Sequence, residues 1–563
     1  MPLLESTIPG LLAERARLQP DEVAYTFIDY DVDPAGFAES LTWSQVYQRA
    51  QVVAEELLRH GRKGDRAAIL APQGLEYIVA FYGAMTAGFI AVPLPVPALG
   101  QLDERVNGAL RDCQPVAVLT TSAVVGDIMT YVGGFTGGAT PTVVEVDALD
   151  FHSPRTAEMN IGDLPEMAYL QYTSGSTRAP AGVIMTHRNV IANVKQVFDD
   201  YMEHRDGIPP QDITMVSWLP FYHDMGLVLG VCAPILCGRR AQLMSPVAFL
   251  EKPSRWVRAL AENPHAWSSA PNFAFDMAAR KTADSDLAGL DLGGVVGIIS
   301  GAERVEPATL HRFVDRFAHF DFCDHMMRPA YGLAEATVFV ATGTWDESAP
   351  AAFFDAEALA QRQVRPCPAG QGTALVRYAV PQSPSVRIVD GDSGRECAAD
   401  AVGEIWVHGD NVADGYWGRP PAEQVGFGAT IVDPSPGTPA GLWLRTGDLG
   451  FVHAGELFIV GRIKDLLIIR GRNHYPEDIE ATVQAITGGR VAAVSVPVRG
   501  TEELVTVVEL KRPADLDSAA LRRFDDVRSQ VTAAISTAHG LSVGDLVLVA
   551  AGSIPTTRRM FWS

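Results

Sequence analysis

Short hydrophobic runs alternate with stretches of helical spacing along the first part of the chain. Residues 41–60, LTWSQVYQRAQVVAEELLRH, place apolar side chains at helical intervals after a threonine-containing start. The apolar run RAAILAP (66–72) comes next, then a helix-like stretch at 77–88, and then FIAVPLPVP at 89–97. Buried strands that alternate with helices are typical of layered α/β proteins, so this pattern predicts an α/β fold.

The strand-like pattern continues well beyond this region. It recurs at 115–121, 140–147, 212–220, 294–300 and 403–409, with helical stretches between these runs. The pattern changes at GRIKD (461–465), and the residues beyond it read as a compact α+β piece. We therefore expect a large N-terminal domain over 1–461 and a small C-terminal domain over 462–563.

Residues 341–385 interrupt the alternation. This segment is rich in alanine, proline and glutamine and has turn residues at both ends. It is predicted to be an insertion.

Composition narrows the class of protein. The chain has 563 residues, 47% of them hydrophobic and 20% charged, which predicts a folded protein of two to four domains. Its formal net charge of −22 disfavours nonspecific binding to nucleic acid or to anionic membranes. The six cysteines form no C-x-x-C pair, which argues against a zinc site or a disulfide framework.

The sequence offers no segment that reads as a membrane span or a signal peptide. Glu5 stands where a signal peptide carries basic residues, and Pro9 interrupts the apolar run that follows. The apolar run at 226–238 is too short to cross a bilayer and contains Pro234. We expect a soluble, cytoplasmic protein.

The stretch YTSGSTRAPAGV (172–183) has the composition of a phosphate-binding loop. Gly175 permits close backbone approach, and successive N–H groups of such a loop can bind an anion. The hydroxyls come from Thr173, Ser174, Ser176 and Thr177. The Walker A spacing is absent, and a polar surface turn is the alternative.

Four further stretches follow in order, each with residues suited to chemistry on a nucleotide. They are SWLPFYHDMGL (217–227), RPAYGLAEAT (328–337), WLRTGDLG (443–450) and GRIKDLLIIRGRNHYPEDIE (461–480). A carboxylate such as Glu335 can hold Mg²⁺, and Asp448 can accept ribose hydroxyls. Any one of these stretches alone is weak evidence for a nucleotide site. A lone histidine such as His223, for example, more often has a structural role.

Together these five motifs resemble those of the adenylate-forming enzymes, which include acyl-CoA synthetases, luciferases and nonribosomal adenylation domains. The resemblance runs from about residue 5 to about residue 557. Within that superfamily the chain is most similar to fatty acyl-AMP ligases of the mycobacterial kind that supply polyketide synthases. Three features support the similarity to fatty acyl-AMP ligases. They are Ala181, where acyl-CoA synthetases usually have lysine, the variant LPFYHDMGL of the second motif, and the insertion at 341–385.

The resemblance implies a large adenylation domain of layered α/β subdomains with a small β-rich subdomain, followed by a small mobile α+β domain. It also implies ATP and Mg²⁺ as cofactors. Thr173, Ser174, Gly175, Ser176 and Thr177 would hold phosphates, and Glu335 the Mg²⁺. Arg178 is either a further cation for the phosphates or a solvated loop arginine.

The remaining roles also follow from the resemblance. The adenine would lie between Tyr331-Gly332 and the loop Gly301-Ala302-Glu303, and the ribose on Asp448 and Arg462. His223 would close the acyl site near the carboxylate, and Lys464 would be the hinge between adenylation and acyl transfer. The candidates for an apolar acyl tunnel are Trp218, Phe221, Met225, Phe273 and Phe275, and ordinary helix packing is the alternative for the last two.

The end of the sequence departs from the family pattern. GSIPTTRRMFWS has Arg558 and Arg559 where the family continues to a lysine that bridges the carboxylate and the α-phosphate, and no lysine follows Lys511. Loss of one such donor can cost about 10²–10³ in rate. A frameshifted or truncated gene, a deliberately altered chain and a natural binding protein remain open, and the first is favoured because MFWS is unlike the family's tail.

The leading hypothesis is therefore an ATP-dependent fatty acyl-AMP ligase that passes its product to an acyl carrier protein or to a polyketide synthase. The first alternative is a fatty acyl-CoA ligase, against which the insertion argues. The second is a protein that binds acyl adenylate but forms it slowly, because of the missing lysine. Acyl chain length, acceptor and oligomeric state are not contained in the sequence.

Overall fold

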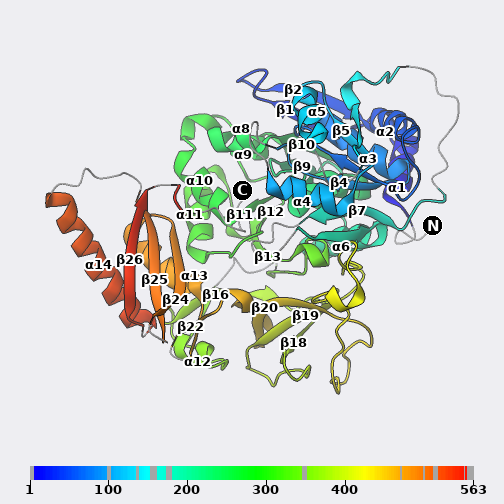
Figure 1. Cartoon of the computed structure of the whole chain (residues 1–563). Coiled ribbons are helices and arrows are strands. Elements are labelled where there is room, and N and C mark those ends of the chain that lie inside the picture. Colours follow the sequence, from blue (N-terminus) through cyan, green and yellow to red (C-terminus); the bar gives the residue numbers. More distant parts are fainter. Residues whose placement is uncertain are drawn as a thin grey trace. The chain divides into compact units, whose positions relative to one another are not determined.

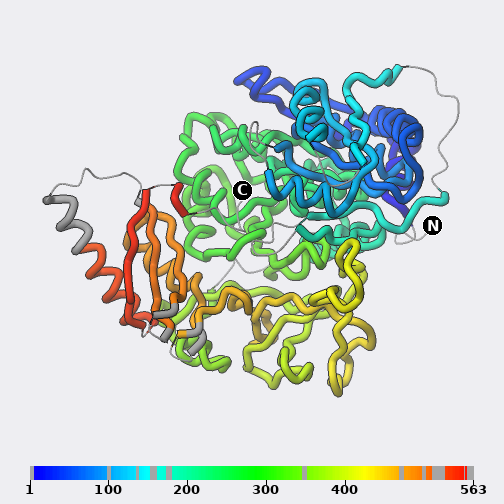
Figure 2. The backbone as a smooth tube through the Cα atoms, in the orientation of Figure 1, coloured from blue at the N-terminus to red at the C-terminus, as the bar shows by residue number. Residues whose placement is uncertain are grey.

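The computed structural model describes residues 6–97, 103–134, 139–152, 162–172, 180–344, 351–469, 472–498, 501–510, 518–539, 541–550 and 552–554. The chain divides into two compact units, and it passes between them more than once (Figure 2). Unit 1 holds residues 1–349, 381–385 and 408–428, and unit 2 holds residues 350–380, 386–407 and 429–563.

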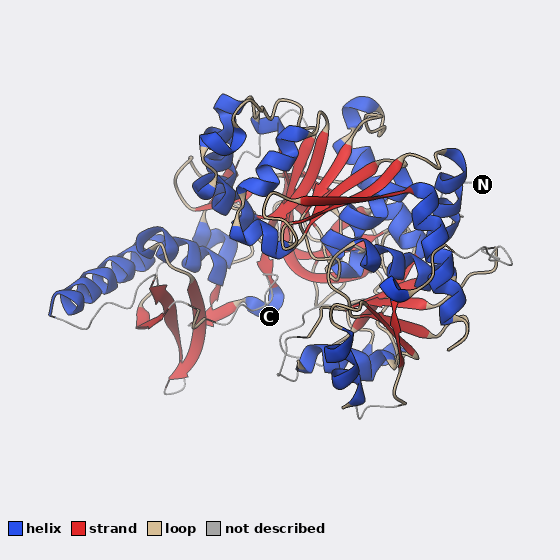
Figure 3. Ribbon diagram, turned by 90° about the horizontal axis from the view of Figure 1, so that it is seen from above, coloured by secondary structure: helices blue, strands red, loops and turns tan. Residues whose placement is uncertain are grey.

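Unit 1 contains an eight-stranded sheet in the order β14-β13-β12-β11-β9-β10-β1-β2 (Figure 1). Its six inner strands are parallel, and an antiparallel strand closes each edge. Helices flank these strands on both sides (Figure 3). The strands are β1 Val23–Asp29, β2 Phe37–Thr42, β9 Thr214–Ser217, β10 Arg240–Met244, β11 Ala266–Pro271, β12 Gly297–Gly301, β13 Met327–Tyr331 and β14 Ala341–Thr342.

A six-stranded sheet in the order β6-β5-β3-β4-β7-β8 completes unit 1. Only the pair β7–β8 is antiparallel. The strands are β3 Arg66–Ile69, β4 Ile90–Pro93, β5 Ala117–Thr120, β6 Thr142–Glu145, β7 Met167–Tyr172 and β8 Gly182–Thr186. The helices of unit 1 are α1 Ile8–Leu18, α2 Trp43–Leu57, α3 Leu75–Thr86, α4 Glu104–Cys113, α5 Val125–Gly133, α6 His187–Tyr201, α7 Ala233–Cys237, α8 Pro246–Glu251, α9 Ser254–Glu262, α10 Asn272–Lys281 and α11 Pro307–Phe317.

Helix α3 joins the two sheets of unit 1. It is buried all round, with the partial exception of Glu76, as expected of a helix that is apolar on every face. Tyr82 donates or accepts a 2.9 Å hydrogen bond with Tyr25 of β1, and the adjacent Phe81 meets Tyr169 of β7 edge-on at 5.6 Å. One turn of α3 therefore contacts a strand of each sheet, which fixes the two sheets against each other.

Unit 2 is built on a five-stranded sheet in the order β17-β21-β20-β19-β18 and a three-stranded sheet β24-β25-β26. Two antiparallel two-stranded sheets, β15–β16 and β22–β23, accompany them. The elements are β15 Ala351–Phe354, α12 Ala356–Ala360, β16 Thr373–Val376, β17 Tyr378–Ala379, β18 Ser385–Val389, β19 Gly403–His408, β20 Leu444–His453, β21 Glu456–Arg462, β22 Leu467–Ile469, β23 Arg472–His474, α13 Pro476–Thr487, β24 Val491–Val498, β25 Thr501–Leu510, α14 Ser518–His539 and β26 Val543–Ala550.

The expected α/β class is confirmed, and the predicted helix at 41–60 is α2, whose Thr42 and Gln45 form a capping box. The predicted insertion at 341–385 begins with β14 of the eight-stranded sheet and also carries β15, α12, β16 and β17 among its described residues. The predicted boundary at 461 falls inside unit 2, and the division into a large domain and a lid stays a prediction. Among the described residues, no helix combines the length and apolar character needed to cross a bilayer.

Candidate functional site

Four neighbouring parallel strands of the large sheet end at the same edge and lead into predicted site residues. Trp218 follows β9, Phe273 lies two residues beyond β11, Gly301 ends β12 and Tyr331 ends β13. The register confirms the alignment, because Pro271 pairs with Gly301. The carboxyl edge of a parallel sheet is where α/β proteins bind ligands. This edge therefore gathers segments that are far apart in the sequence.

Aromatic side chains line the segments after β9 and β11. Trp218 stacks on Phe249 with ring centroids 3.9 Å apart and meets Phe273 edge-on at 6.2 Å. Phe221 packs edge-on against Tyr77 of α3 at 5.6 Å. Such large rings contribute apolar surface in fixed geometry, which suits an apolar ligand. The structure thus brings Trp218 and Phe273, both predicted acyl-site residues, into contact.

Phe275 lies in a different environment. It is fully buried and packs edge-on against Trp256 at 5.8 Å and Phe313 at 5.3 Å. These rings belong to α9, α10 and α11, so Phe275 makes the ordinary helix packing that we considered as its alternative. Its place in an acyl tunnel stays a prediction.

His223 forms an ion pair with its neighbour Asp224. Its Nδ1 lies 2.7 Å from Asp224 Oδ1, which also accepts a 2.7 Å hydrogen bond from the Met225 backbone N–H. Burial opposes a charge on the imidazole, but the carboxylate outweighs it and raises the pKa of His223 above its ordinary 6.5. A π-helical turn, Gly226–Cys232, begins directly after this pair, and such turns are frequent at functional sites.

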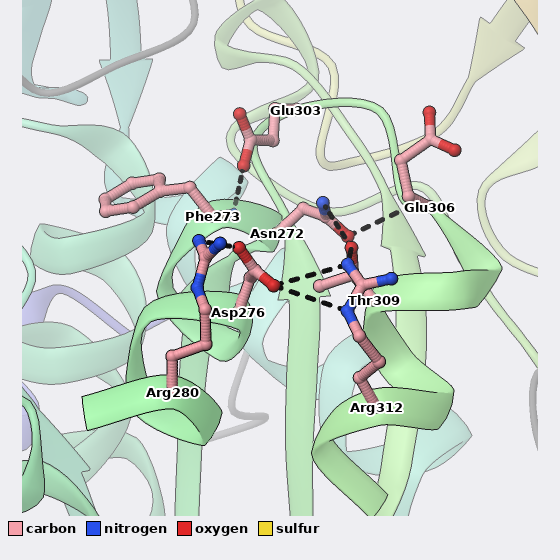
Figure 4. Close-up of polar contacts among 8 residues, drawn as sticks. All are labelled: Asn272, Phe273, Asp276, Arg280, Glu303, Glu306, Thr309 and Arg312. Carbon is pink, nitrogen blue, oxygen red and sulfur yellow. Dashed lines mark hydrogen bonds and ion pairs between the residues drawn. The ribbon is translucent and has the colours of Figure 1, made fainter. Parts of the chain in front are cut away.

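Glu303 connects the predicted adenine loop to helix α10 (Figure 4). Its Oε1 accepts a 2.6 Å hydrogen bond from the Phe273 backbone N–H in the first turn of that helix. Gly301 approaches the end of β13 so closely that an added Cβ would lie 3.3 Å from the Ala330 carbonyl and 3.9 Å from Met225 Sδ. Ala302 has a positive φ of 65°. The loop is therefore held between β13, Met225 and α10.

Glu335, the predicted Mg²⁺ ligand, lies in a short helical turn after β13. Its Oε1 accepts a 2.7 Å hydrogen bond from the Tyr416 hydroxyl, and its carbonyl accepts one of 2.9 Å from the Ala413 backbone N–H. No group of three metal-ligating side chains occurs within the described part of the chain. A single carboxylate fits Mg²⁺, which usually takes one or two protein carboxylates together with substrate phosphates.

The predicted phosphate residues Thr173, Ser174, Gly175, Ser176 and Thr177 lie outside the described residues, but the two strands that border them are described. Tyr172 ends β7 and donates a 2.7 Å hydrogen bond to Asp112 of α4. Gln171 donates one of 2.8 Å to the carbonyl of Tyr222, next to His223. The strand that leads into the predicted phosphate-binding residues therefore lies beside the loop that carries His223.

The remaining predicted residues belong to unit 2. Asp448 on β20 is buried and pairs in register with Arg462 on β21, with Nε 2.9 Å from Oδ1. Lys464 follows in a short exposed turn, Ile463–Asp465. The structure brings the two predicted ribose residues together. Their role toward a nucleotide, like the hinge role of Lys464, stays a prediction.

Sequence reasoning missed Tyr416, which binds the predicted site residue Glu335. It also missed Asp112 and Asn272, which bind segments next to predicted site residues. Tyr416 stands 81 positions from Glu335 along the chain. Its sequence surroundings, DGYWG, read as an ordinary turn. Nothing in the spacing of the motifs points to any of these three, because each acts through a contact made only in the folded chain.

Comparison with known proteins shows the family of this chain. The AMP-binding enzyme family matches residues 12–417, more than half of the chain, and the chain therefore belongs to the AMP-binding enzymes. The long-chain-fatty-acid–AMP ligase FadD28 of Mycobacterium tuberculosis is 55% identical over 552 residues, which cover 98% of this chain and 95% of that protein. A Mycobacterium leprae relative that carries the name fatty-acid–CoA ligase fadD21 is 56% identical, with the same two coverages.

Solved structures give the same result. A fatty acyl-adenylate ligase from L. pneumophila, in complex with acyl adenylate and pyrophosphate, matches with a TM-score of 0.74 and 31% identity over 98% of this chain and 94% of that one. A structure from work on fatty acyl-adenylate ligases of E. coli and L. pneumophila matches with a TM-score of 0.82 and 28% identity, covering 98% and 95%. The predicted adenylate-forming family is thus confirmed.

Proposed function

We propose that this chain activates a long-chain fatty acid with ATP, giving acyl-AMP and pyrophosphate. The observation that carries the proposal is the shared carboxyl edge of β9, β11, β12 and β13. The aromatic pair Trp218–Phe273 lies at this edge of the sheet. The loop that begins at Gly301 and the segment of Tyr331 and Glu335 lie at the same edge. An apolar acid and a nucleotide can thus bind side by side, as an attack of carboxylate on the α-phosphate requires.

The protein's own part in this reaction is alignment and charge stabilisation. Glu335 would hold Mg²⁺, which, when bound, neutralises charge on the phosphates. Tyr416 fixes the Glu335 carboxylate, and Gln171 ties the phosphate-loop strand to the His223 segment. The protonated form of His223, favoured by Asp224, would attract the fatty carboxylate toward the phosphorus.

The test is pyrophosphate release from Mg-ATP that depends on added fatty acid, with acyl-AMP confirmed by mass. A series from octanoate to palmitate would define chain length. The assay is run on this sequence and on a second one whose last residues follow the family pattern with its lysine. Activity in either supports the proposal. If neither protein forms acyl-AMP with any acid, the substrate assignment is wrong.

A fatty acyl-CoA ligase is the second candidate, since a relative carries that name. One core of unit 2 bears on it. Phe354 and Leu375 of the two-stranded sheet β15–β16 are buried together with Phe451 and Phe458 of the five-stranded sheet. The same core contains Tyr475, which follows the predicted hinge at Lys464. Rotation at that hinge would open this core. Its burial supports an acyl-AMP ligase, which would pass its product to the phosphopantetheine thiol of an acyl carrier protein or polyketide synthase in the cytoplasm.

The assay separates these candidates when CoA and a phosphopantetheinylated acyl carrier protein are offered in parallel. We expect acyl transfer to the carrier protein and little acyl-CoA. Acyl-CoA formed as fast as acyl-AMP would establish the CoA ligase instead.

The His223–Asp224 pair predicts a pH dependence of fatty-acid binding. The pKa of His223 is raised, so the imidazolium persists above pH 6.5 and is lost as the pH rises through the raised value. We expect the Kd for dodecanoate, measured by calorimetry, to increase through that interval. Asp224→Asn removes the stabilising charge and should move the inflection to lower pH, while His223→Gln should abolish it. An inflection that stays in place in Asp224→Asn would contradict this role.

A further inference from the structure

The first turn of α10 and the loop before α11 hold each other by reciprocal hydrogen bonds (Figure 4). The loop offers the Glu303 carboxylate to the Phe273 backbone N–H, at 2.6 Å. In return, the Asn272 side chain accepts a 3.0 Å hydrogen bond from the Glu306 backbone N–H through Oδ1, and its Nδ2 lies 3.4 Å from Thr309 Oγ1. Two segments that serve different parts of the site are thus joined from both sides.

Glu303 also caps the N-terminus of α10, where the helix's own N-cap residue provides no side-chain acceptor. The N-cap residue of α10 is Pro271, whose side chain cannot accept a hydrogen bond, so the first N–H groups of the helix need another acceptor. A carboxylate at a helix N-terminus gains from the helix dipole as well as from the hydrogen bond. The start of α10, and with it the Phe273 ring beside Trp218, is therefore fixed by a residue of another loop.

The loop contains one residue in an unfavourable backbone conformation. Ala302 has φ 65°, a left-handed conformation that costs a non-glycine residue about 1 kcal/mol. Its neighbour Glu303 is the residue bound to α10.

A second contact joins α10 to the helix that follows the loop. Arg312 of α11 binds both Asp276 of α10, at 3.3 Å, and Thr309, at 2.9 Å. Movement of the Ala302 loop would therefore move the first turn of α10.

We propose that Glu303 is a positioning residue that couples nucleotide binding at the Gly301-Ala302-Glu303 loop to fatty-acid binding beside Phe273. The inference rests on the proposed function and deepens it. A nucleotide that orders the loop fixes the Glu303 carboxylate, which fixes the first turn of α10 and the aromatic wall that receives the acyl chain. Because such coupling is reciprocal, a fatty acid must strengthen nucleotide binding by the same factor.

The test uses binding alone, so it does not depend on the rate of adenylation. The Kd of AMP is measured by calorimetry with and without saturating dodecanoate, and the Kd of dodecanoate with and without AMP. For the native chain we expect each ligand to strengthen the other by at least about 5-fold, within the range of measured coupling. In Glu303→Ala the two ligands should bind independently, with a ratio near one.

Three further variants sharpen the result. Glu303→Gln keeps an acceptor oxygen and should retain part of the coupling, whereas Asn272→Ala breaks the second contact and should lower it even if Glu303→Ala does not fold. Glu306→Gln is the matched control in the same loop, since its side chain lies 3.5 Å from Arg304 and its contact with Asn272 uses the backbone. It should keep the native ratio.

The outcomes separate the inference from the proposed function. A ratio near one in the native chain, or an unchanged ratio in both Glu303→Ala and Asn272→Ala, overturns the coupling while leaving a fatty acyl-AMP ligase possible. A variant that weakens both ligands equally at an unchanged ratio shows a purely structural contact and also overturns it. Failure of the native chain to bind either AMP or any fatty acid overturns the proposed function itself.

Discussion

Glu335→Gln is expected to lower fatty-acid-dependent pyrophosphate release by about 10²–10³. The glutamine keeps the size of the side chain and an oxygen for the Tyr416 hydroxyl, 2.7 Å away in the native chain, but it loses the charge that attracts a hard cation. Without Mg²⁺ beside it, the triphosphate keeps charge that repels the attacking carboxylate.

The Kd of ATP with and without Mg²⁺ gives a readout independent of turnover. Mg²⁺ should strengthen ATP binding to the native chain and have little effect on Glu335→Gln. Tyr416→Phe is the control, because it removes one hydrogen bond to the carboxylate and keeps the charge, for which we expect a loss of about 10-fold. An equal Mg²⁺ effect on ATP binding in the native chain and in Glu335→Gln would remove Glu335 from the metal site.

Gly332→Ala is expected to have the largest effect on the folded structure at the site. A Cβ at this position would lie 1.8 Å from the Val338 carbonyl oxygen, 2.7 Å from its carbon and 3.0 Å from the Phe339 Cα. All three atoms are backbone, so no change of rotamer relieves the clash. The turn after β13, where the Val340 N–H donates a 2.8 Å hydrogen bond to the Tyr331 carbonyl, must open to admit the methyl group.

We expect Gly332→Ala to cost about 3 kcal/mol in the free energy of unfolding and to abolish measurable AMP binding. Urea unfolding followed by circular dichroism, together with AMP calorimetry, checks both effects. Gly126→Ala is the matched control. Gly126 lies in helix α5, and apart from its chain neighbours and the backbone of its own helix nothing lies within 4 Å of the added Cβ. Alanine there should stabilise the helix by up to about 1 kcal/mol. Equal stabilities of the two variants would show that the turn after β13 tolerates the methyl group.

The individual strands could be predicted from the sequence better than the order in which they pair within a sheet. The apolar runs at 66–72 and 294–300 overlap β3 and β12. They could be predicted because an unbroken apolar run is typical of a buried strand. The order of the strands could not be read in this way. In the sheet β9 lies between β10 and β11, whereas in the chain β10 lies between β9 and β11.

The same limit applies to the candidate site. His223, Tyr331 and Glu335 stand in motifs that can be recognised locally, and three of the four strands that carry the site were predicted as elements or motifs. The residues that hold them could not be foreseen. Tyr416 reaches Glu335, and Asp112 reaches Tyr172, through contacts between distant segments. Such contacts leave no periodic or compositional pattern in the chain.

The return of residues 408–428 to unit 1 means that the two units cannot be separated by a single cut in the gene. A fragment ending at residue 349 would contain Glu335 but not Tyr416, and Thr337 would lose the Asn411 carbonyl to which its hydroxyl donates at 2.7 Å. The Phe339 carbonyl would lose the Asn411 side chain, which now donates to it at 3.2 Å, and would keep the 2.7 Å hydrogen bond from Asn193. Exchange of the C-terminal part by simple end-to-end fusion after residue 349 would therefore also remove contacts that hold the segment from Glu335 to Thr337.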